Sequence, residues 1–473
     1  MIDLRQLERL DFDGKNVTVV GLGIEGVDFV RYLARRGANV TISDSKPRSK
    51  LADRLHDVEG LAVNLSLGKN DDRTLTRADA VFLSQSVPLD LPAIDAARRS
   101  GVPMHSMVNL FLELAPGPVV AITGSSGKTT TTALVAEMMR ADERDVFVGG
   151  NIGVGLLEHI EGLRPYTWSV LEVSHTQLQL VDRSAHIAAV LNITPNHLDR
   201  FSWDEYKRLK GNAIRYQEPD DIAVLGYDDP EARALAHEVK GRLIWFTTGP
   251  KAPGDSVFVR NGIVMADLGG VEEPLFSLSA IQLRGVHNHQ NATAAAAIAL
   301  AAGVSPDAIA CGVGSFRGVQ HRLEYVAEVG GVRFYNDSIA TTPERTLAGL
   351  LSYEEPVVLL LGGRDKDLPM GEMAREALRR CRGIVLFGEA AGLLEAALLR
   401  EKNPRHVPIV RVADLEAGVA EARKLAQPGD VVLLSPACTS YDAYDNFERR
   451  GEHFRALVRA AAGKAQEAMP SRR

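Results

Sequence analysis

The chain has 473 residues, of which 45% are hydrophobic and 24% charged, and its formal net charge is −7. This length suits two to four domains of ordinary globular composition, and the lack of a basic excess argues against nucleic-acid binding. The three cysteines have neither paired nor metal-ligand spacing, and the N-terminus lacks the apolar core of a signal peptide. The apolar runs are too short to span a bilayer. These features predict a cytoplasmic protein with no membrane contact.

Short runs rich in β-branched residues alternate along the chain with amphipathic helical stretches. Most of these runs are continuously apolar, which is typical of parallel strands buried on both faces, so the predicted fold class is α/β. An Ala-rich run at residues 292–304 is expected to form a buried helix. Strands are expected at residues 17–21, 38–44, 78–84, 118–124, 168–174, 187–194, 332–338, 356–363, 383–389 and 431–437.

Two boundaries divide the chain into three predicted domains. APGP at residues 115–118 comes directly before a strand that opens a nucleotide-binding motif, and FRGVQHR at residues 316–322 follows the Ala-rich helix. We therefore expect domains at residues 1–115, 116–317 and 318–473.

The strongest local motif is a phosphate-binding loop, AITGSSGKTTTT, between a predicted strand and a helix. Glycines let backbone N–H groups curl around phosphate oxygens, and the helix N-terminus adds its dipole. Lys128 can neutralise the β and γ phosphates, and the Thr129 hydroxyl can ligate Mg²⁺. An ordinary glycine turn is the alternative, but Lys-Thr directly after glycine disfavours it. The motif predicts an ATP site, without naming a reaction, at Gly124, Ser125, Ser126, Gly127, Lys128, Thr129 and Thr130.

A second glycine motif, GLGIEG at residues 21–26, follows the first predicted strand, and Asp44 ends the next strand. In form this is a dinucleotide-binding fingerprint, and taken alone it predicts an NAD-dependent dehydrogenase. A redox enzyme has no need for the separate ATP loop. The alternative is a first domain that holds a nucleotide carried by the substrate.

Taken together and in order, ten motifs resemble the Mur ligase family nearly end to end. The resemblance implies an N-terminal Rossmann-like domain that binds UDP, a central ATPase domain with a mainly parallel sheet, and a C-terminal Rossmann-like domain that brings the amino acid. It implies an ATP-dependent ligase, expected to be a monomer, that joins D-glutamate to UDP-N-acetylmuramoyl-L-alanine through an acyl phosphate in peptidoglycan precursor synthesis. The motifs are GLGIEG, ITGSSGKTT, GGNIG, LEVSHTQL, LNITPNHLDR, GVHNHQN, QHRLE, NDSIATT, LLGGRDKD and LLSPACTSYDAYDNFERRG.

The resemblance also assigns roles in the central domain. Glu172 matches a Mg²⁺ ligand beside Thr129, and His197 matches the ligand of a second Mg²⁺; the alternatives are a solvent-facing carboxylate and a structural histidine. Lys210, aligned on the spacing from Tyr206, matches a lysine that CO₂ carbamylates to bridge Mg²⁺. Lys207 is a competing choice, and an ordinary solvated lysine remains an alternative.

Further assignments concern ligands. Asn288 and Asn291 match ATP contacts, with helix capping as the alternative, and Arg322 and Asp337 match contacts to ATP phosphate and ribose. Phe447 is assigned to the glutamate pocket, and core packing is its alternative. The remaining pocket residues are Thr341, Lys366 and Ser440, and those on the UDP-muramoyl side are Ile24, Asp44, Ser45, Ser84, Asn151, Ser174 and Gln177.

Three departures from the family pattern gather near the expected substrate. Ile339 stands where the family usually has Lys, SHTQ at 174–177 replaces SSFQ, and SQSV at 84–87 replaces SPGI. They leave ligation of L-glutamate open as an alternative. A folylpolyglutamate synthase is a second alternative, disfavoured by GLGIEG. A nucleotide-driven switch or motor is a third, and it would hydrolyse ATP without any UDP-sugar.

Overall fold

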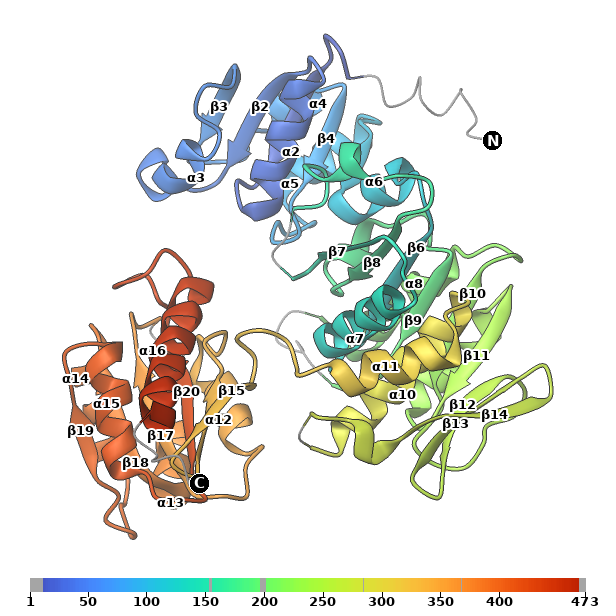
Figure 1. The fold of residues 1–473 in the computed structure, drawn as a ribbon. Coiled ribbons are helices and arrows are strands. Elements are labelled where there is room, and N and C mark those ends of the chain that lie inside the picture. The colour runs from blue at the N-terminus through green and yellow to red at the C-terminus, as the bar shows by residue number, and fades with distance from the viewer. Residues whose placement is uncertain (1–11, 153–154, 196–200, 284, 367, 468–473) are drawn as a thin grey trace. The chain divides into compact units, whose positions relative to one another are not determined.

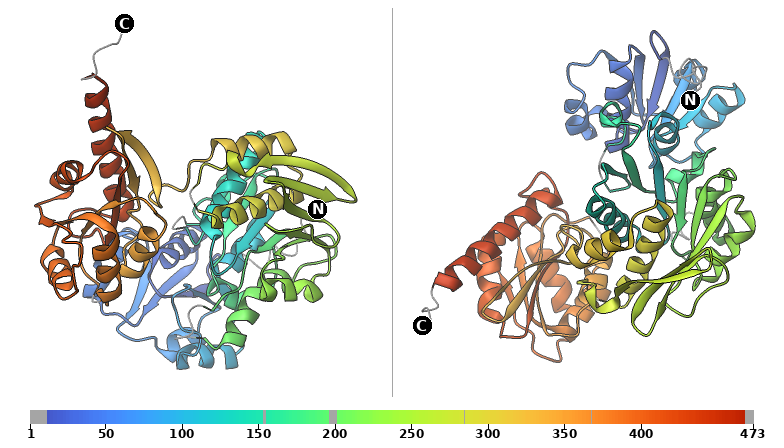
Figure 2. Two further views of the ribbon diagram at one scale, coloured as in Figure 1. Left: turned by 90° about the horizontal axis from the view of Figure 1, so that it is seen from below. Right: turned by 45° about the vertical axis from the view of Figure 1, so that its right-hand side comes forward.

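The computed structural model describes residues 12–152, 155–195, 201–283, 285–366 and 368–467 (Figures 1 and 2). The chain divides into two compact units: Met1–Ile281 with Val286–Phe316, and Gln282–Gly285 with Arg317–Arg473. The first unit contains two sheets and the second contains one. Among the described helices, none combines the length and apolar character needed to cross a membrane.

The first sheet is parallel, in the order β3-β2-β1-β4-β5 (Figure 1). Alternate residues of β1 point to opposite faces, so Val19 joins one apolar core with Phe29 of α2, and Val20 joins another with Ile94 of α5. Both faces are thus buried, as the continuously apolar strands predict. The elements are β1 (Asn16–Val20), α2 (Ile24–Arg35), β2 (Asn39–Asp44), η1 (Arg48–Lys50), α3 (Ala52–His56), β3 (Val63–Leu67), α4 (Asp72–Thr76), β4 (Ala80–Leu83), α5 (Pro92–Arg99), β5 (Met104–Ser106) and α6 (Met107–Leu114).

The second sheet runs in the order β14-β13-β12-β11-β10-β9-β6-β8-β7. It is parallel up to β12, where an antiparallel meander of three strands forms the edge. Strand β6 lies between β9 and β8, so its carboxyl end opens at an interior position of the sheet. Helices α10 and α11 pack against α7 (Figure 1). The elements are β6 (Val119–Thr123), α7 (Lys128–Ala141), β7 (Val146–Gly150), η2 (Ile160–Gly162), β8 (Trp168–Glu172), η3 (Gln177–Leu180), β9 (Ile187–Val190), α8 (Trp203–Arg215), β10 (Ile222–Gly226), α9 (Pro230–Ala234), η4 (Leu235–Glu238), β11 (Arg242–Phe246), β12 (Ser256–Arg260), β13 (Ile263–Leu268), β14 (Val271–Ser277), η5 (Leu278–Ala280), α10 (His287–Ala301) and α11 (Pro306–Ser315).

The third sheet has the order β15-β16-β20-β17-β18-β19, and β15 is its antiparallel edge strand. Its two faces form two separate cores: Leu359 packs with α12, α13 and α14, whereas Leu360 packs with α15 and α16. This is a doubly wound layer arrangement. The elements are β15 (Glu324–Val329), β16 (Val332–Asn336), α12 (Pro343–Leu350), β17 (Val357–Gly362), α13 (Gly371–Arg380), β18 (Cys381–Phe387), α14 (Ala391–Leu399), β19 (Ile409–Arg411), α15 (Leu415–Leu425), β20 (Val431–Ala437) and α16 (Phe447–Glu467).

The predicted α/β class is confirmed, and every strand expected from the sequence is present within a few residues of its expected bounds. The Ala-rich run forms most of the buried helix α10. Sequence reasoning missed several edge strands, such as half-exposed β3, which lacks the continuous apolar run of a buried central strand. It also missed the meander β12–β14 and the interior strands β10 and β11, although β10 is mostly buried.

Candidate active site

The predicted phosphate loop joins β6 to α7, and its backbone needs glycine at two positions. Gly124 and Gly127 have φ values of 159° and 80°, and a Cβ on Gly127 would lie 2.3 Å from the Asn291 Oδ1. Lys128 folds back over the loop, and its Nζ donates to the carbonyl oxygens of Gly124 at 2.9 Å and Ser125 at 3.2 Å. Thr129 and Thr130 follow in the half-buried first turn of α7. The helix N-terminus and the lysine together make a site for phosphate.

Lys210 lies directly beneath this loop. It is 1% exposed, and its Nζ donates to the Thr123 hydroxyl and to the Gly124 carbonyl oxygen, both at 3.0 Å. Burial, and next the charge of Lys128, hold the pKa of Lys210 well below its usual range, while Glu172 acts in the opposite direction. A buried lysine in this state can present a neutral, nucleophilic amine.

The competing choice, Lys207, lies on a neighbouring, less buried face of α8. Its half-buried side chain pairs with Asp204 at 3.1 Å and Glu231 at 3.6 Å, and its ammonium group lies over the Trp203 ring. Positions 207 and 210 differ by three residues, so helical geometry alone would place them on neighbouring faces. The structure brings Lys210 to the phosphate loop and leaves Lys207 at the surface.

Glu172 ends strand β8, next to β6, and is 3% exposed. Its Oε1 accepts a hydrogen bond from the Asn151 side chain at 2.9 Å. Its Oε2 is buried and accepts no hydrogen bond from the residues that the structure describes. A buried carboxylate oxygen left in this state is suited to a hard divalent cation, because such cations bind oxygen ligands. The alternative for Glu172, a carboxylate that faces bulk solvent, is therefore wrong, because the side chain is buried.

His197, the second predicted Mg²⁺ ligand, lies outside the described residues. Among the described residues, no group of three or more His, Cys, Asp or Glu side chains gathers as a preformed metal site. Asn288 and Asn291 are buried one turn apart inside α10, joined by a 2.8 Å hydrogen bond. They are not at the capping position, which Val286 occupies, so the capping alternative is wrong.

In the first domain, the GLGIEG turn is held from two sides. Asp44 accepts from the backbone N–H of Leu22 and of Lys46, both at 2.8 Å, and the Ser84 hydroxyl donates to the Gly21 carbonyl oxygen at 2.6 Å. Two of the residues predicted for the UDP-muramoyl side, Asp44 and Ser84, therefore stabilise the turn itself. The other two of this domain, Ile24 and Ser45, lie exposed beside it.

Sequence reasoning missed Glu25, the acidic residue inside GLGIEG. Its carboxylate accepts from the Gln177 side chain at 2.7 Å and from the Gln85 backbone N–H at 2.7 Å. Burial raises the pKa of Glu25 above its usual value. Gln177 also accepts from the Ser174 backbone N–H at 3.0 Å, so two predicted substrate residues belong to the same network. Two features of the sequence could have indicated this network: an acidic residue, Glu25, within a glycine turn, and a glutamine, Gln85, in SQSV.

The second unit contains the remaining predicted residues. Asp337 is buried, accepts from the Ser435 hydroxyl at 2.8 Å and the Leu323 backbone N–H at 3.2 Å, and burial raises its pKa to about 7. Arg322 is exposed, and its charge partly offsets the effect of burial on the pKa of Asp337. The Asp337 carboxyl group therefore has a pKa of about 7 and lies near the exposed, positively charged Arg322.

The predicted glutamate pocket is also partly assembled within this unit. The Lys366 Nζ donates to the Thr341 hydroxyl at 3.3 Å, and burial, followed by the charge of Arg345, lowers the pKa of Lys366. Ser440 is buried near the start of the loop after β20. Phe447 is only half-buried and belongs to neither core of this sheet, which disfavours core packing as its role.

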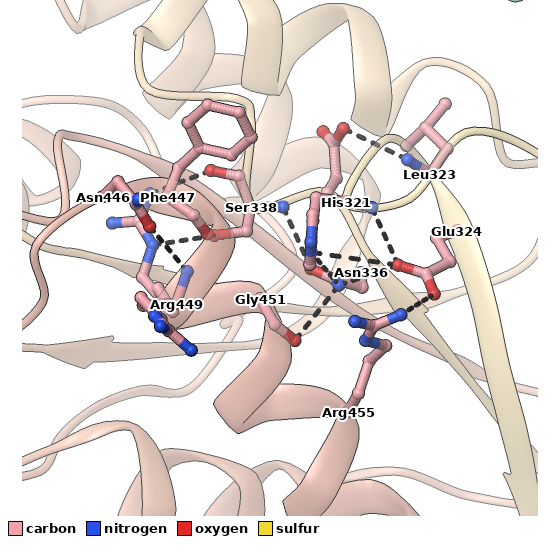
Figure 3. Close-up of polar contacts among 12 residues, drawn as sticks. His321, Leu323, Glu324, Asn336, Ser338, Asn446, Phe447, Arg449, Gly451 and Arg455 are labelled. Carbon is pink, nitrogen blue, oxygen red and sulfur yellow. Dashed lines mark hydrogen bonds and ion pairs between the residues drawn. The ribbon is translucent and has the colours of Figure 1, made fainter. Parts of the chain in front are cut away.

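Figure 3 shows how the first turn of α16 contacts the segment before β15. The Asn336 side chain lies 2.9 Å from the His321 Nδ1 and donates to Glu324 at 3.0 Å and to the Gly451 carbonyl oxygen at 3.3 Å. A Cβ on Gly451 would lie 2.0 Å from the His321 Nδ1, so glycine is needed for this approach. The Ser338 hydroxyl donates to the Phe447 carbonyl oxygen at 2.8 Å, which fixes the start of the helix.

The Ile339 position has no cationic side chain, but a cation lies close by. Arg345, on α12, donates to the Ile339 carbonyl oxygen at 3.4 Å and acts on the pKa of Lys366. An exposed guanidinium therefore stands near the place where the family usually has lysine.

Comparison with known proteins gives the family. The chain matches the MurD-like N-terminal domain of Mur ligases over residues 15–106, the Mur ligase middle domain over 122–299 and the Mur ligase glutamate ligase domain over 321–438. The chain belongs to the Mur ligase family, whose members are ATP-dependent, amide-forming ligases.

Whole-chain relatives have a common name. The chain is 43% identical to the UDP-N-acetylmuramoylalanine–D-glutamate ligase of Symbiobacterium thermophilum, over 94% of this chain and 98% of the relative. It is 39% identical to the ligase of that name from Geotalea daltonii, over 96% and 99%.

Solved structures support the three-sheet architecture. The fold resembles UDP-N-acetylmuramate-alanine ligase from Thermotoga maritima, with a TM-score of 0.53 and 19% identity over 94% of this chain and all of that one. It also resembles MurF from Acinetobacter baumannii, with a TM-score of 0.55 and 17% identity over 97% and 98%.

Proposed function

We propose that this chain joins D-glutamate to UDP-N-acetylmuramoyl-L-alanine, with ATP as the energy source and ADP and phosphate as products. The observation that carries the proposal is the cluster beneath the phosphate loop. Lys128, Lys210 and the buried carboxylate of Glu172 gather there, in a chain whose whole-length relatives have this activity as their name. A cytoplasmic monomer acting on small molecules is part of the proposal, and the three free cysteines agree with a reducing compartment.

The reaction has two steps. The alanyl carboxylate takes the γ-phosphoryl group of ATP, giving an acyl phosphate and ADP. The glutamate amine then attacks the acyl carbon, the C–O bond to phosphate breaks, and the amine loses a proton as the amide forms. Activation is required because a carboxylate does not condense with an amine in water.

The chain's own residues supply positive charge where these anionic reactants meet. Lys128, on the loop, neutralises the transferring phosphate, and preorganised cations of this kind stabilise the transition state. Lys366, beside Thr341, is suited to pair with a carboxylate of the amino acid. Asn288 and Asn291, which border Gly127 through Asn291, are placed to contact the nucleotide.

Two Mg²⁺ ions are part of the proposal, held by Thr129, Glu172, Lys210 and His197. When bound, Mg²⁺ would neutralise phosphate charge and polarise the transferring group. The buried Glu172 Oε2, which accepts no hydrogen bond from the described residues, fits such an ion. For Lys210 to join Glu172 it must become an anion: its neutral amine adds to CO₂, a C–N bond forms, and a proton leaves. The burial of Lys210 and its lowered pKa support this carbamylation.

The test measures phosphate release from ATP with UDP-N-acetylmuramoyl-L-alanine, and D-glutamate and L-glutamate are supplied in parallel. Release with D-glutamate alone, together with a product of the expected mass, is the predicted result. Release with L-glutamate alone would keep the mechanism and change the substrate. Release without any amino acid would favour a nucleotide-driven switch.

A further inference from the structure

Arg450 has no part in the mechanism above, yet it is among the largest fully buried side chains of the described chain, with 0% exposure. It lies in the first turn of α16, directly after the exposed Arg449. Long charged side chains are almost never fully buried unless they are paired. The burial of Arg450 therefore indicates a specific structural role.

The Arg450 guanidinium binds loops that follow three neighbouring strands. Its Nε donates to the Ser338 hydroxyl at 3.0 Å and its Nη2 to the Ser338 carbonyl oxygen at 2.9 Å, beyond β16. Its Nη1 donates to the carbonyl oxygens of Thr439 at 3.0 Å and Cys438 at 3.2 Å, after β20, and of Gly362 at 3.3 Å, at the end of β17. Strand β20 lies between the other two, so one planar group fixes all three loops.

These three loops are the ones that bear the proposed amino-acid pocket. Thr341 and Lys366 lie a few residues after Ser338 and Gly362, respectively. Ser440 comes directly after Thr439. The second and third loops are also paired through the backbones of Arg364 and Thr439, at 2.9 Å in both directions. A displacement of the guanidinium would therefore move all parts of the pocket together.

The charge of Arg450 is dispersed over neutral hydrogen-bond partners, and the nearby charge of Asp442 offsets it only in part. Each of the five acceptors is a neutral carbonyl or hydroxyl oxygen. The nearby carboxylate of Asp442 accepts instead from the Glu389 backbone N–H at 3.2 Å. Burial lowers the pKa of Arg450 to about 10, so the group stays cationic near neutral pH. Its charge also reaches Lys366, where it lowers the pKa after the larger effects of burial and Arg345.

We propose that Arg450 is a positioning residue of the amino-acid pocket: it fixes the three loops, and its positive charge favours an amino acid with two carboxylates. This inference rests on the proposed function and deepens it by assigning the recognition of glutamate to a buried group that need not touch the substrate. Removal of Arg450 therefore weakens glutamate binding more than binding of ATP or of the UDP-linked acceptor.

The test compares R450K, R450Q and the matched control R449Q in the full-length chain. Lysine keeps the charge but loses the planar fork, and glutamine keeps a donor but loses the charge. Arg449 is exposed and paired with Glu452, so R449Q reports the general effect of removing an arginine from this turn. We measure KM for glutamate, ATP and the UDP-linked acceptor, together with kcat and thermal unfolding.

R450K is expected to raise the KM for glutamate about tenfold, and R450Q further, with the other two KM values within about twofold of wild type. R449Q should change none of them. If R450Q does not fold, S338A removes one acceptor while keeping the charge, and it should raise only the KM for glutamate, by about threefold.

Equal changes in all three KM values, or an unchanged KM for glutamate in folded R450K, would overturn this inference and leave the proposed function intact. No glutamate-dependent phosphate release by wild type, with either enantiomer, would overturn the proposed function and this inference with it.

Discussion

Two buried basic side chains, Lys210 in the central domain and Arg450 in the C-terminal domain, lie in similar surroundings. Both donate to carbonyl and hydroxyl oxygens, and among the described residues no carboxylate accepts a hydrogen bond from either group. Their chemistry differs because a lysine amine can lose its proton when desolvated, whereas a guanidinium keeps its charge. The same kind of site therefore yields a reactive amine in one domain and a permanent charge in the other.

This difference separates the expected effects of mutation. Changes around Lys210 should act on the chemical step and lower kcat, because the phosphate loop and Glu172 surround it. Changes around Arg450 should act on recognition of the amino acid and raise KM. Substitutions in the two regions therefore test this division through kcat and KM.

Lys128→Ala should abolish turnover, because the loop would lose the cation that neutralises the phosphates. Phosphate release is the measurement, and far-UV circular dichroism checks that the variant folds. A folded variant with substantial activity would exclude this loop as the ATP site.

Lys210→Ala should lower kcat by about a thousandfold, and acetate should restore part of the loss by supplying a carboxylate. Lys207→Ala, on the exposed side of α8, is the matched control and should be close to wild type. Lys210→Arg sharpens the comparison with Arg450, because a guanidinium cannot form the carbamate and should be as inactive as alanine.

The carbamate itself can be observed by NMR after equilibration with ¹³C-bicarbonate. A carbamate signal is expected in wild type and in Lys207→Ala, and should be missing from Lys210→Ala. Full activity of Lys210→Ala, or a signal that survives this substitution, would contradict the assignment.

Lys366→Ala should raise the KM for glutamate about tenfold with a smaller change in kcat, because a group that pairs with the amino-acid carboxylate is lost. Steady-state kinetics with each substrate varied in turn provides the measurement. A KM for glutamate equal to that of wild type would remove Lys366 from the pocket.

Asp337→Asn should change the pH dependence of stability. Burial raises the Asp337 pKa to about 7, whereas an unfolded aspartate titrates near about 4. Between these values the folded chain keeps a proton that the unfolded chain releases, so the free energy of unfolding of wild type falls as pH rises.

Asparagine does not titrate, so Asp337→Asn should gain in Tm relative to wild type between about pH 4 and about pH 7. Thermal unfolding of both proteins across this window is the measurement. Parallel Tm curves for the two proteins would contradict the raised pKa.

Much of the candidate site could be predicted from motifs in which chemistry and local backbone are linked. The phosphate loop requires glycine and lysine at fixed spacing, and the structure places both as expected. Gln177 was also predicted, but its contact with Glu25 was not, because the two residues are 152 positions apart. Sequence spacing carries no information about such a pair.

The sequence by itself determined the α/β class, the phosphate loop and most of the central strands, because continuous apolar runs and glycine turns act over a few neighbouring residues. Only the tertiary structure decided which of two lysines on α8 is buried and which of two adjacent arginines lies beneath a pocket. Lys207 and Lys210, like Arg449 and Arg450, have identical side chains, and helical periodicity fixes only their relative directions. The packing of each helix against its sheet then buries one basic side chain of each pair and leaves the other more exposed.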